Sequence, residues 1–339
     1  MMDWGQLWTA ALVAVLVAGI LTPFLRGWLM QQNLVDLPGE RRSHSVPTPR
    51  GGGAAIVFAL IFANLVSGLP WWPGLFLLLL LGILGWVEDR HELSAPSRLV
   101  VQALVAVLAL SLIGPVTSVD VFGQTMHLPW FWTLLSGIAI VWLINLHNFM
   151  DGSDGLAAMQ GVWSGLAMGV LMLRADLFTH AAFALALAGG YAGFLLWNRP
   201  PARIFMGDSG SMALGGGVAL LVLAGATSGG VSIWVSLIIT SLFVVDATAT
   251  LARRVANGER WYNAHRQHAY QRLIAVGWSH GRVLVLYAAI NLGLVLPMTL
   301  LAIAHPQIET VLAFILVGLL LGGWWVIEFA TNTENRRHG

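Results

Sequence analysis

The chain contains no cysteine and no lysine, and only 10% of its 339 residues are charged. Without cysteine it has neither a disulfide framework nor a thiolate nucleophile. A formal net charge of +1 and the lack of any basic run longer than two residues argue against nucleic-acid binding, which requires a dense phosphate-neutralising patch. Soluble domains carry about 25% charged residues, whereas 57% of this chain is hydrophobic. The composition therefore predicts an integral membrane protein.

Apolar stretches of roughly 17–25 residues, bounded by charged or turn residues, predict an all-α polytopic membrane protein with about eleven transmembrane helices. The first stretch has no basic flank and no clear small-residue cleavage site, so we interpret it as a retained helix and not as a signal peptide. We find no internal repeat, and the chain is predicted to form a single membrane domain over residues 1–339. The predicted spans are residues 5–25, 52–68, 71–87, 98–114, 129–146, 156–173, 178–197, 209–226, 230–251, 282–304 and 308–330.

The arginines predict the orientation of the chain. All 17 basic residues are arginines, and all but Arg174 fall in segments that one alternating topology places on the same side. Because cytoplasmic loops near span ends carry the excess of positive charge, this asymmetry predicts an N-terminus outside and a cytoplasmic C-terminus. Nearly every motif with chemical content lies on the same face, so we expect the active site there. The predicted cytoplasmic loops are residues 27–51, 88–97, 147–155, 198–208 and 252–281.

The first of these loops carries Asp36, Arg41, His44 and Arg50, followed by three glycines at 51–53. Arginine and histidine suit phosphate, and the glycines allow a ligand to approach backbone N–H groups closely. The alternative is that the arginines only follow the positive-inside rule around a Pro/Gly turn.

The next loop begins with the adjacent carboxylates Glu88 and Asp89. A charge drawn into the membrane centre costs roughly 2.5–3.5 kcal/mol, so a pair at the end of a span suggests a function. Paired carboxylates suit a divalent cation or a proton acceptor with a raised pKa. Simple solvation at the membrane edge is the alternative.

A series of amides and acids is the most specific motif. Asn145, Asn148, Asp151 and Asp154 are three residues apart, so neighbouring members share a helix face, but all four converge only if the helix breaks. Gly152 and Gly155 permit such a break. Oxygen ligands on a glycine-containing turn, without cysteine, suit Mg²⁺ far better than zinc. A structural turn would explain the repeated Asp-Gly but not two amides and two acids in register.

Two further polar strings follow on the same face. Ser209, Gly210 and Ser211 are predicted to open a helix whose backbone donors are available to an anion, with Asp208 as an N-cap or metal ligand. The loop 252–281 carries a His/Arg group at His265, Arg266 and His268. The two histidines resemble a zinc pair, but no third ligand follows at a suitable spacing. We favour phosphate or diphosphate binding, with a solvated basic loop as the alternative.

Together these strings supply acids and amides for Mg²⁺, basic groups for phosphates and a membrane body for a lipid, which is the combination expected for phosphoryl transfer at a membrane surface. Their order and spacing resemble the polyprenyl-phosphate N-acetylhexosamine-1-phosphate transferases, the MraY/WecA superfamily. The resemblance runs from about residue 30 to residue 275 in five ordered motifs. The string 264–271 is similar to the WbpL-like enzymes that initiate O-antigen synthesis.

The resemblance implies transfer of an N-acetylated amino-sugar 1-phosphate from a UDP-sugar to undecaprenyl phosphate, with release of UMP. It also implies a multi-pass protein of the bacterial inner membrane, acting in the first membrane step of O-antigen and lipopolysaccharide synthesis. The expected donor carries a 6-deoxy sugar such as N-acetylfucosamine, or N-acetylglucosamine. The expected cofactor is Mg²⁺, with Mn²⁺ as a substitute. The resemblance leaves open whether the chain is a monomer or a homodimer.

Residue roles also follow from the resemblance. Asp208 and Asn148 are expected to ligate Mg²⁺, with Glu88 and Asp89 beside it and one of them accepting a proton from the lipid phosphate. Asp151 is expected to support the site. The chain departs from the family at Glu88, where an aspartate is usual, and it lacks the triple-His pattern of the peptidoglycan-precursor enzyme. Expected substrate contacts are Asp154 and Phe205 with uracil, His265, Arg266 and His268 with diphosphate or sugar, and also Asp36, Arg41, His44, Arg50 and Asn145.

Two other classes of protein are considered. A lipid or ion transporter with an inner-face phosphate site would place charge near mid-span, where Asp246 is the one plausible candidate. A non-catalytic lipid-binding scaffold would need the arginines but not the series of amides and acids. Neither class is favoured.

Overall fold

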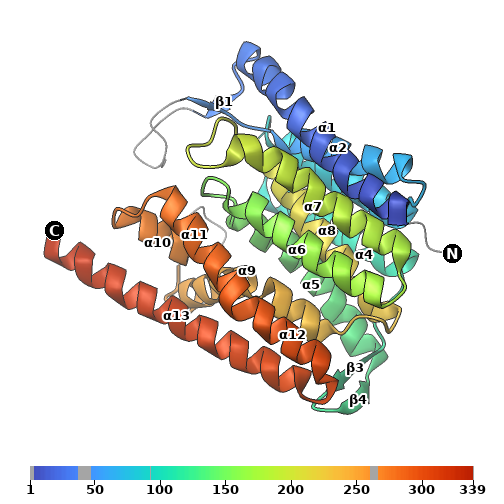
Figure 1. Cartoon of the computed structure of the whole chain (residues 1–339). Coiled ribbons are helices and arrows are strands. Elements are labelled where there is room, and N and C mark those ends of the chain that lie inside the picture. The colour runs from blue at the N-terminus through green and yellow to red at the C-terminus, as the bar shows by residue number, and fades with distance from the viewer. Residues whose placement is uncertain (1–3, 37–46, 92, 260–265, 339) are drawn as a thin grey trace. The chain divides into compact units, whose positions relative to one another are not determined.

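The computed structural model describes residues 4–36, 47–91, 93–259 and 266–338, with side chains through residue 333. The chain is 77% helical and divides into two compact units (Figure 1). The N-terminal unit comprises the chain up to Val119 and Thr125–Ile233. The C-terminal unit comprises Asp120–Gln124 and Trp234–Gly339.

The N-terminal unit is built around α8. This helix contacts α2, α3, α5, α6 and α7, and 83% of its 18-residue apolar stretch is buried. Its glycines allow the close contacts that small residues provide between membrane helices, since a Cβ on Gly215 would lie 2.4 Å from Leu143 O. Figure 1 shows α7 lying between α1 and α6, both of which it contacts. The helices are α1 (Trp4–Gln31), α2 (Gly53–Val66), α3 (Trp72–Glu88), α4 (Ala95–Leu112), α5 (Pro129–Phe149), α6 (Leu156–Arg174), α7 (Phe178–Asn198) and α8 (Asp208–Thr227).

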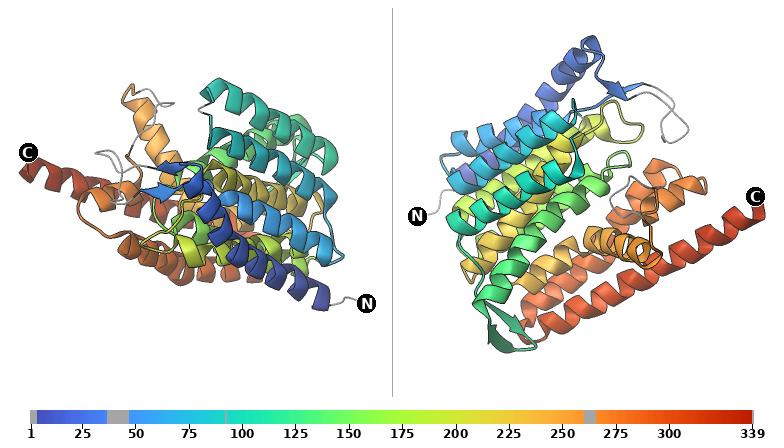
Figure 2. Two further views of the ribbon diagram at one scale, coloured as in Figure 1. Left: turned by 90° about the horizontal axis from the view of Figure 1, so that it is seen from above. Right: turned by 180° about the vertical axis from the view of Figure 1, so that it is seen from behind.

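The C-terminal unit contains α9 and a group of helices that follow it. Within this unit α13 contacts α10 and α12, and both views of Figure 2 show α13 as one long helix. A π-helical segment, η1, joins α11 to α12 just before Pro297, which has no N–H to continue the α-helical ladder. The elements are α9 (Ile233–Ala256), α10 (Ala269–Ala275), α11 (His280–Ile290), η1 (Asn291–Val295), α12 (Leu296–Ala304), η2 (Pro306–Ile308) and α13 (Glu309–His338).

Strands are few and short. β1 (Val35–Asp36) pairs antiparallel with β2 (Thr48–Pro49), with Asp36 opposite Thr48. β3 (Ser118–Val121) and β4 (Gln124–His127) lie in the connection between α4 and α5.

The helices follow the predicted spans closely. Within the described residues, nine helices are long and apolar enough to cross a membrane, which supports a polytopic membrane protein. The predicted spans 52–68 and 71–87 form the shorter apolar helices α2 and α3, of 14 and 17 residues.

The predicted loops, in contrast, are shorter in the structure. α1 continues to Gln31, so the first loop begins later than residue 27, and α13 continues past residue 330. The predicted loop 252–281 contains the end of α9, all of α10 and the start of α11. The single-domain assignment stays a prediction.

Candidate active site

Two segments that are far apart in the sequence run side by side where α2 and α8 begin. Phe205 N donates to Pro49 O at 2.8 Å, and Gly52 N donates to Phe205 O at 3.0 Å. Gly53 N then donates to Met206 O at 2.8 Å. We expected the glycine run to leave its N–H groups to a ligand. That expectation is wrong for Gly52 and Gly53, because backbone carbonyls of the same chain accept from both.

The same glycines are required by close packing. A Cβ on Gly53 would lie 2.0 Å from Gly210 N, and one on Gly52 would lie 2.5 Å from the Phe194 ring. Gly51 has φ +112°, a conformation that favours glycine. The close packing of Gly51–Gly53 therefore places Arg50, the residue before them, next to the beginning of α8.

Asp89 satisfies the first backbone donors of α8. Its carboxylate accepts from Asp208 N at 2.8 Å and from Ser209 N at 3.1 Å. The approach requires glycine on both sides, since a Cβ on Gly207 would lie 2.5 Å from Asp89 Oδ1 and one on Gly85 would lie 2.3 Å from the Asp208 carbonyl carbon. We expected these helix donors to bind an external anion. The structure corrects this, because a carboxylate of the chain itself occupies them.

Gly207, and not Asp208, is the N-cap of α8, so Asp208 is the first helical residue. The Asp208 carboxylate is thereby left to interact with other side chains.

Arg50 joins the two acids. Its Nε lies 3.1 Å from Asp89 Oδ1 and its Nη2 lies 2.6 Å from Asp208 Oδ1. The Arg50 side chain is 46% exposed, whereas those of Asp89 and Asp208 are 2% and 10% exposed, so the guanidinium lies at the mouth of the cluster. Burial lowers the pKa of Arg50, but Asp208 and Asp89 outweigh it and raise that pKa above its ordinary value. Arg50 therefore stays charged.

Asp151 adds a third carboxyl group to the field of this single guanidinium. Burial raises its pKa well above the ordinary value, Arg50 opposes that shift, and Asp208 and Asp89 add to it. The pKa of Asp89 is likewise raised by burial and then by Asp208. Three acids facing one cation leave negative charge uncompensated, so the site favours a further cation.

The residues present fit Mg²⁺ as that cation. Within the described chain, no three His, Cys, Asp or Glu side chains form a group that holds a metal unaided. Mg²⁺ does not need such a cage, because it usually keeps several waters and binds one or two carboxylates plus substrate phosphates. Carboxylate oxygen at Asp208 and an amide oxygen at Asn148, a half-buried residue, belong to the ligand class that Mg²⁺ prefers.

The helix break expected in the amide and acid series is present. α5 ends at Phe149, α6 begins at Leu156, and Gly155 between them has φ +75°. Asn198, which the sequence analysis did not select, holds this turn. Its Oδ1 accepts from Gly155 N at 3.0 Å, and its Nδ2 donates to Ile204 O at 2.9 Å. Its position at a span end, just before two prolines, is the signal that could have identified it.

Asp154 and Phe205 lie on segments that this bridge connects. Asp154 Oδ2 accepts from Ala202 N at 2.9 Å, and both residues of the expected uracil pair are half-buried. Part of each side chain is therefore accessible to a ligand, and their role stays a prediction.

Asn145 points into the helix bundle. Its Nδ2 donates to Gln102 Oε1 at 2.6 Å and to Val141 O at 2.8 Å. Gln102 is buried on α4, so the amide at 145 connects two helices, and its substrate role stays a prediction. Asp36 is half-buried in the β1–β2 pair.

Glu88 has partners different from those of Asp89. Its Oε1 lies 3.0 Å from Arg98 Nη1, and its Oε2 accepts from Leu93 N at 3.2 Å. The longer side chain at this position thus reaches across the turn to the start of α4. Asp89 is committed to the α8 backbone, so of the pair Glu88 is the one whose partners lie away from that helix.

The C-terminal unit holds part of the His/Arg group. His268 is buried, with Nδ1 3.6 Å from Asp246 Oδ1, while Arg266 is exposed. Asp246 also accepts from Tyr287 Oη at 2.7 Å and from Ala269 N at 2.9 Å. Asp246, which the sequence analysis named as the possible mid-span charge of a transporter, therefore anchors the start of α10. Arg41, His44 and His265 lie outside the described residues.

The profile of glycosyl transferase family 4 matches residues 71–226, which contain the acid pair, the turn after α5 and the start of α8. A probable undecaprenyl-phosphate N-acetylglucosaminyl 1-phosphate transferase of Bacillus subtilis is 32% identical over 290 residues, or 82% of this chain and 80% of that protein. This chain therefore belongs to glycosyl transferase family 4. As a family member it is a transferase of the polyprenyl-phosphate sugar-1-phosphate type, which confirms the superfamily that the motifs resembled.

Two further relatives carry a different name. A phospho-N-acetylmuramoyl-pentapeptide-transferase of Picosynechococcus sp. is 32% identical over 329 residues, covering 86% of this chain and 85% of that protein. A protein of the same name from Heliobacterium modesticaldum is 37% identical over 232 residues, covering 63% of this chain and 72% of that protein. Membership of the family is therefore shown, while the donor sugar is not.

Proposed function

We propose that this family member transfers an N-acetylated amino-sugar 1-phosphate from a UDP-sugar to undecaprenyl phosphate. An oxygen of the lipid phosphate forms a bond to the β-phosphorus of the donor. The bond from that phosphorus to the bridging oxygen breaks, and UMP leaves with that oxygen. The products are undecaprenyl-diphosphate-sugar and UMP.

The observation that carries the proposal is the cluster of Arg50, Asp89 and Asp208 at the beginning of α8, with Asp151 in its field. Arg50 is held by two acids and stays charged, so it is available to an anionic phosphate while its position is fixed. Asp89 keeps α8 and Asp208 in place. When bound, Mg²⁺ would neutralise charge on the transferring phosphate. Asp208 and Asn148 would hold it.

We assign the proton-accepting role to the pair Glu88 and Asp89, with Glu88 the better candidate. Asp89 accepts two backbone N–H groups and pairs with Arg50, and these bonds would be lost on protonation. Glu88 accepts from one backbone N–H, that of Leu93, and pairs with a single arginine, Arg98. In the donor, the uracil would lie against Phe205 with Asp154 as its hydrogen-bond partner, as the resemblance implies.

The relatives and the sequence motifs point to different donor sugars. The Bacillus subtilis relative is named for N-acetylglucosaminyl 1-phosphate, and the other two are named for a phospho-N-acetylmuramoyl-pentapeptide. The missing triple-His pattern argues against the pentapeptide donor. The resemblance of residues 264–271 to WbpL-like enzymes favours a 6-deoxy donor such as UDP-N-acetylfucosamine, and with it a role in starting O-antigen synthesis.

Competition between donors tests this proposal. The purified protein would receive undecaprenyl phosphate, Mg²⁺ and equal concentrations of UDP-N-acetylfucosamine, UDP-N-acetylglucosamine and UDP-N-acetylmuramoyl-pentapeptide, and the lipid products would be separated by mass. An apolar pocket rejects an added hydroxyl only by about 10² at most, so we expect preference for the 6-deoxy donor with use of the glucosamine donor. A clear win for the glucosamine donor would contradict the 6-deoxy assignment and leave the transferase assignment intact. A product only from the pentapeptide donor would contradict both sugar assignments.

The transporter alternative loses its main support. Asp246 was the candidate mid-span charge, but its oxygens accept from Tyr287 and from the backbone of α10. A buried acid with these partners has a structural explanation.

A further inference from the structure

Residues 266–268 form a short segment that is fixed immediately before α10. The capping-box residue Gln271 accepts from His268 N at 3.3 Å, and Asp246 accepts from Ala269 N at 2.9 Å. Asp246 is itself held by Tyr287, so the C-terminal end of the segment is anchored to α9 and α11. If this segment binds the diphosphate or sugar of the UDP-sugar donor, as the family resemblance implies for Arg266 and His268, its geometry matters for the reaction.

Gln267 fixes the middle of the segment through both groups of its side-chain amide and through its backbone carbonyl. Its Oε1 accepts from Arg253 Nη2, and its Nε2 donates to Glu259 Oε2 at 3.0 Å. Its backbone carbonyl accepts from Arg272 Nε at 2.8 Å. Two arginines, from α9 and from α10, therefore define where Gln267 lies.

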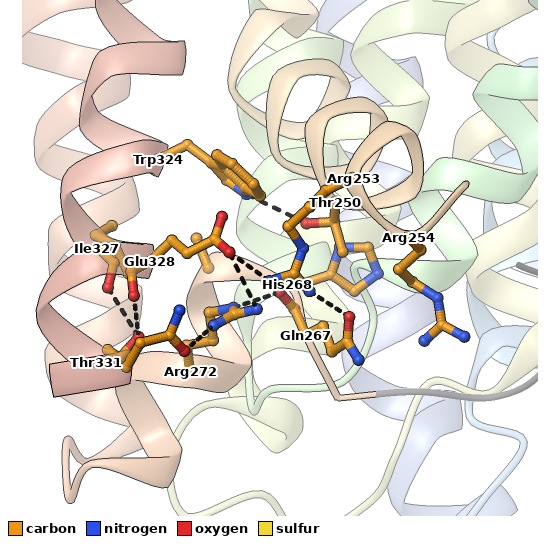
Figure 3. A network of polar contacts seen from close by, with 12 residues as sticks. Thr250, Arg253, Arg254, Gln267, His268, Arg272, Trp324, Ile327, Glu328 and Thr331 are labelled. Atoms are coloured by element: carbon orange, nitrogen blue, oxygen red, sulfur yellow. Dashed lines mark hydrogen bonds and ion pairs between the residues drawn. The ribbon is translucent and has the colours of Figure 1, made fainter. Parts of the chain in front are cut away.

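Glu328 on α13 holds both of these arginines. Its Oε1 lies 2.5 Å from Arg253 Nη1 and 3.8 Å from Arg272 Nη2, and its side chain is 16% exposed. Figure 3 shows Glu328 extending from α13 toward the two guanidinium groups, with Gln267 on their far side. Arg272 also donates to Asn332, one turn further along α13, at 3.1 Å. One carboxylate thus keeps two like charges together.

Arg266 is the arginine that this network does not use. It is exposed, and in the part of the chain that the structure describes it has no ion-pair partner. Arg253, Arg254 and Arg272 are each paired with Glu259 or Glu328. An exposed guanidinium next to a fixed glutamine is suited to an anionic group of a substrate.

We propose that Glu328, on the C-terminal helix, is a positioning residue for donor binding. It acts by holding Arg253 and Arg272 so that Gln267 sets the positions of Arg266 and His268. The inference rests on the proposed function, because it assigns the segment to the diphosphate of the UDP-sugar. Glu328 itself touches no substrate.

The first test is kinetic. Glu328→Gln removes the charge and keeps the shape, so the two arginines lose the group that holds them together. We expect the KM for the UDP-sugar to rise about tenfold, within the roughly hundredfold that a displacement of 1 Å can cost. The KM for undecaprenyl phosphate should stay within about twofold. Glu328→Asp keeps the charge and should lie between the wild type and Glu328→Gln. An unchanged donor KM in Glu328→Gln would overturn the proposal.

Two controls separate positioning from loss of fold. Glu309→Gln makes the same change at the other end of α13, about 28 Å along the helix, and should leave the donor KM unchanged. The double variant Arg272→Gln/Glu328→Gln should raise the donor KM by less than the product of the two single effects, since both residues act on the position of Gln267. Fully additive effects on the free energy of donor binding would contradict this, as would an equal rise in the KM values of both substrates.

The second test needs no turnover. Hydrogen–deuterium exchange of the purified wild type and Glu328→Gln should show faster exchange in residues 266–273 of the variant, with exchange in α8 unchanged. Unchanged exchange in 266–273 would overturn the positioning role. If the wild type transfers no sugar from any UDP donor, the proposed function fails, and the exchange result alone still decides whether Glu328 positions this segment.

Discussion

At the scale of single residues, the site depends on an imbalance of charge. Asp89, Asp151 and Asp208 face one guanidinium, Arg50, and burial first, then the neighbouring acids, raise the pKa values of Asp89 and Asp151. Two of the acids have structural roles. Asp89 accepts hydrogen bonds from the first backbone N–H groups of α8, and both Asp89 and Asp208 form ion pairs with Arg50. The negative charge that Arg50 does not compensate favours the binding of a divalent cation.

Asp208→Asn is expected to lose most turnover, because removal of one group that stabilises a transferring phosphate or its metal typically costs about 10²–10³ in rate. UMP release from the purified variant measures the loss. Asp176→Asn is the matched control, since Asp176 lies in the turn between α6 and α7 with φ 58°, a conformation that asparagine tolerates. UMP release at a near wild-type rate in EDTA would show the metal assignment to be wrong.

The pKa directions predict how the metal requirement changes with pH. Mg²⁺ binds the deprotonated carboxylates, so protons compete with it. Because the pKa values of Asp89 and Asp151 are raised, this competition begins at a higher pH than for ordinary aspartates. The Mg²⁺ concentration for half-maximal UMP release should therefore rise as the pH is lowered from about 8 to about 6. A half-saturating concentration independent of pH over this range would contradict the assignment.

At the scale of helices and strands, the beginning of α8 depends on glycine in α3. A Cβ on Gly85 would lie 2.3 Å from the Asp208 carbonyl carbon, which is backbone and cannot move aside cheaply. Gly85→Ala should displace the start of α8, lower the free energy of unfolding by about 1–3 kcal/mol and reduce UMP release. Gly27→Ala is the matched control, because nothing lies within 4 Å of a Cβ at Gly27 in α1. Equal activity and thermal stability in both variants would mean that α3 and α8 are not this close.

The same contacts show why the sequence predicted some elements and not others. Hydropathy over 20 residues identifies a membrane helix, so the spans were found, and the break after Phe149 followed from Gly152 and Gly155. The N–H groups of Gly53 and Ser209 were misassigned, because whether a donor is free depends on a segment far away in sequence. Local pattern carries no information about that pairing. For the same reason the sequence could not predict the partners of Asp246 or the role of Asn198, because their partners lie on other segments.

At the scale of the whole molecule, the distribution of arginines predicts which side of the membrane carries the active site. We propose that the site faces the cytoplasm, because all but one of the arginines lie in segments on that side of the predicted topology. The UDP-sugar fits this assignment, since it is a charged, water-soluble molecule and the chain presents Arg50 and Arg266 at least partly exposed.

Single cysteines can test the orientation directly, because the chain has no cysteine of its own and each variant carries one thiol. Thr117 and Asn257 are exposed and follow α4 and α9, whose last residues the topology places on opposite sides. Thr117→Cys should react with an impermeant maleimide in intact cells, whereas Asn257→Cys should react only after permeabilisation. Labelling of both in permeabilised cells controls for access. The reverse pattern would place the Arg50 cluster on the outer face, where a cytoplasmic UDP-sugar does not reach it, and would overturn the assignment of the active face.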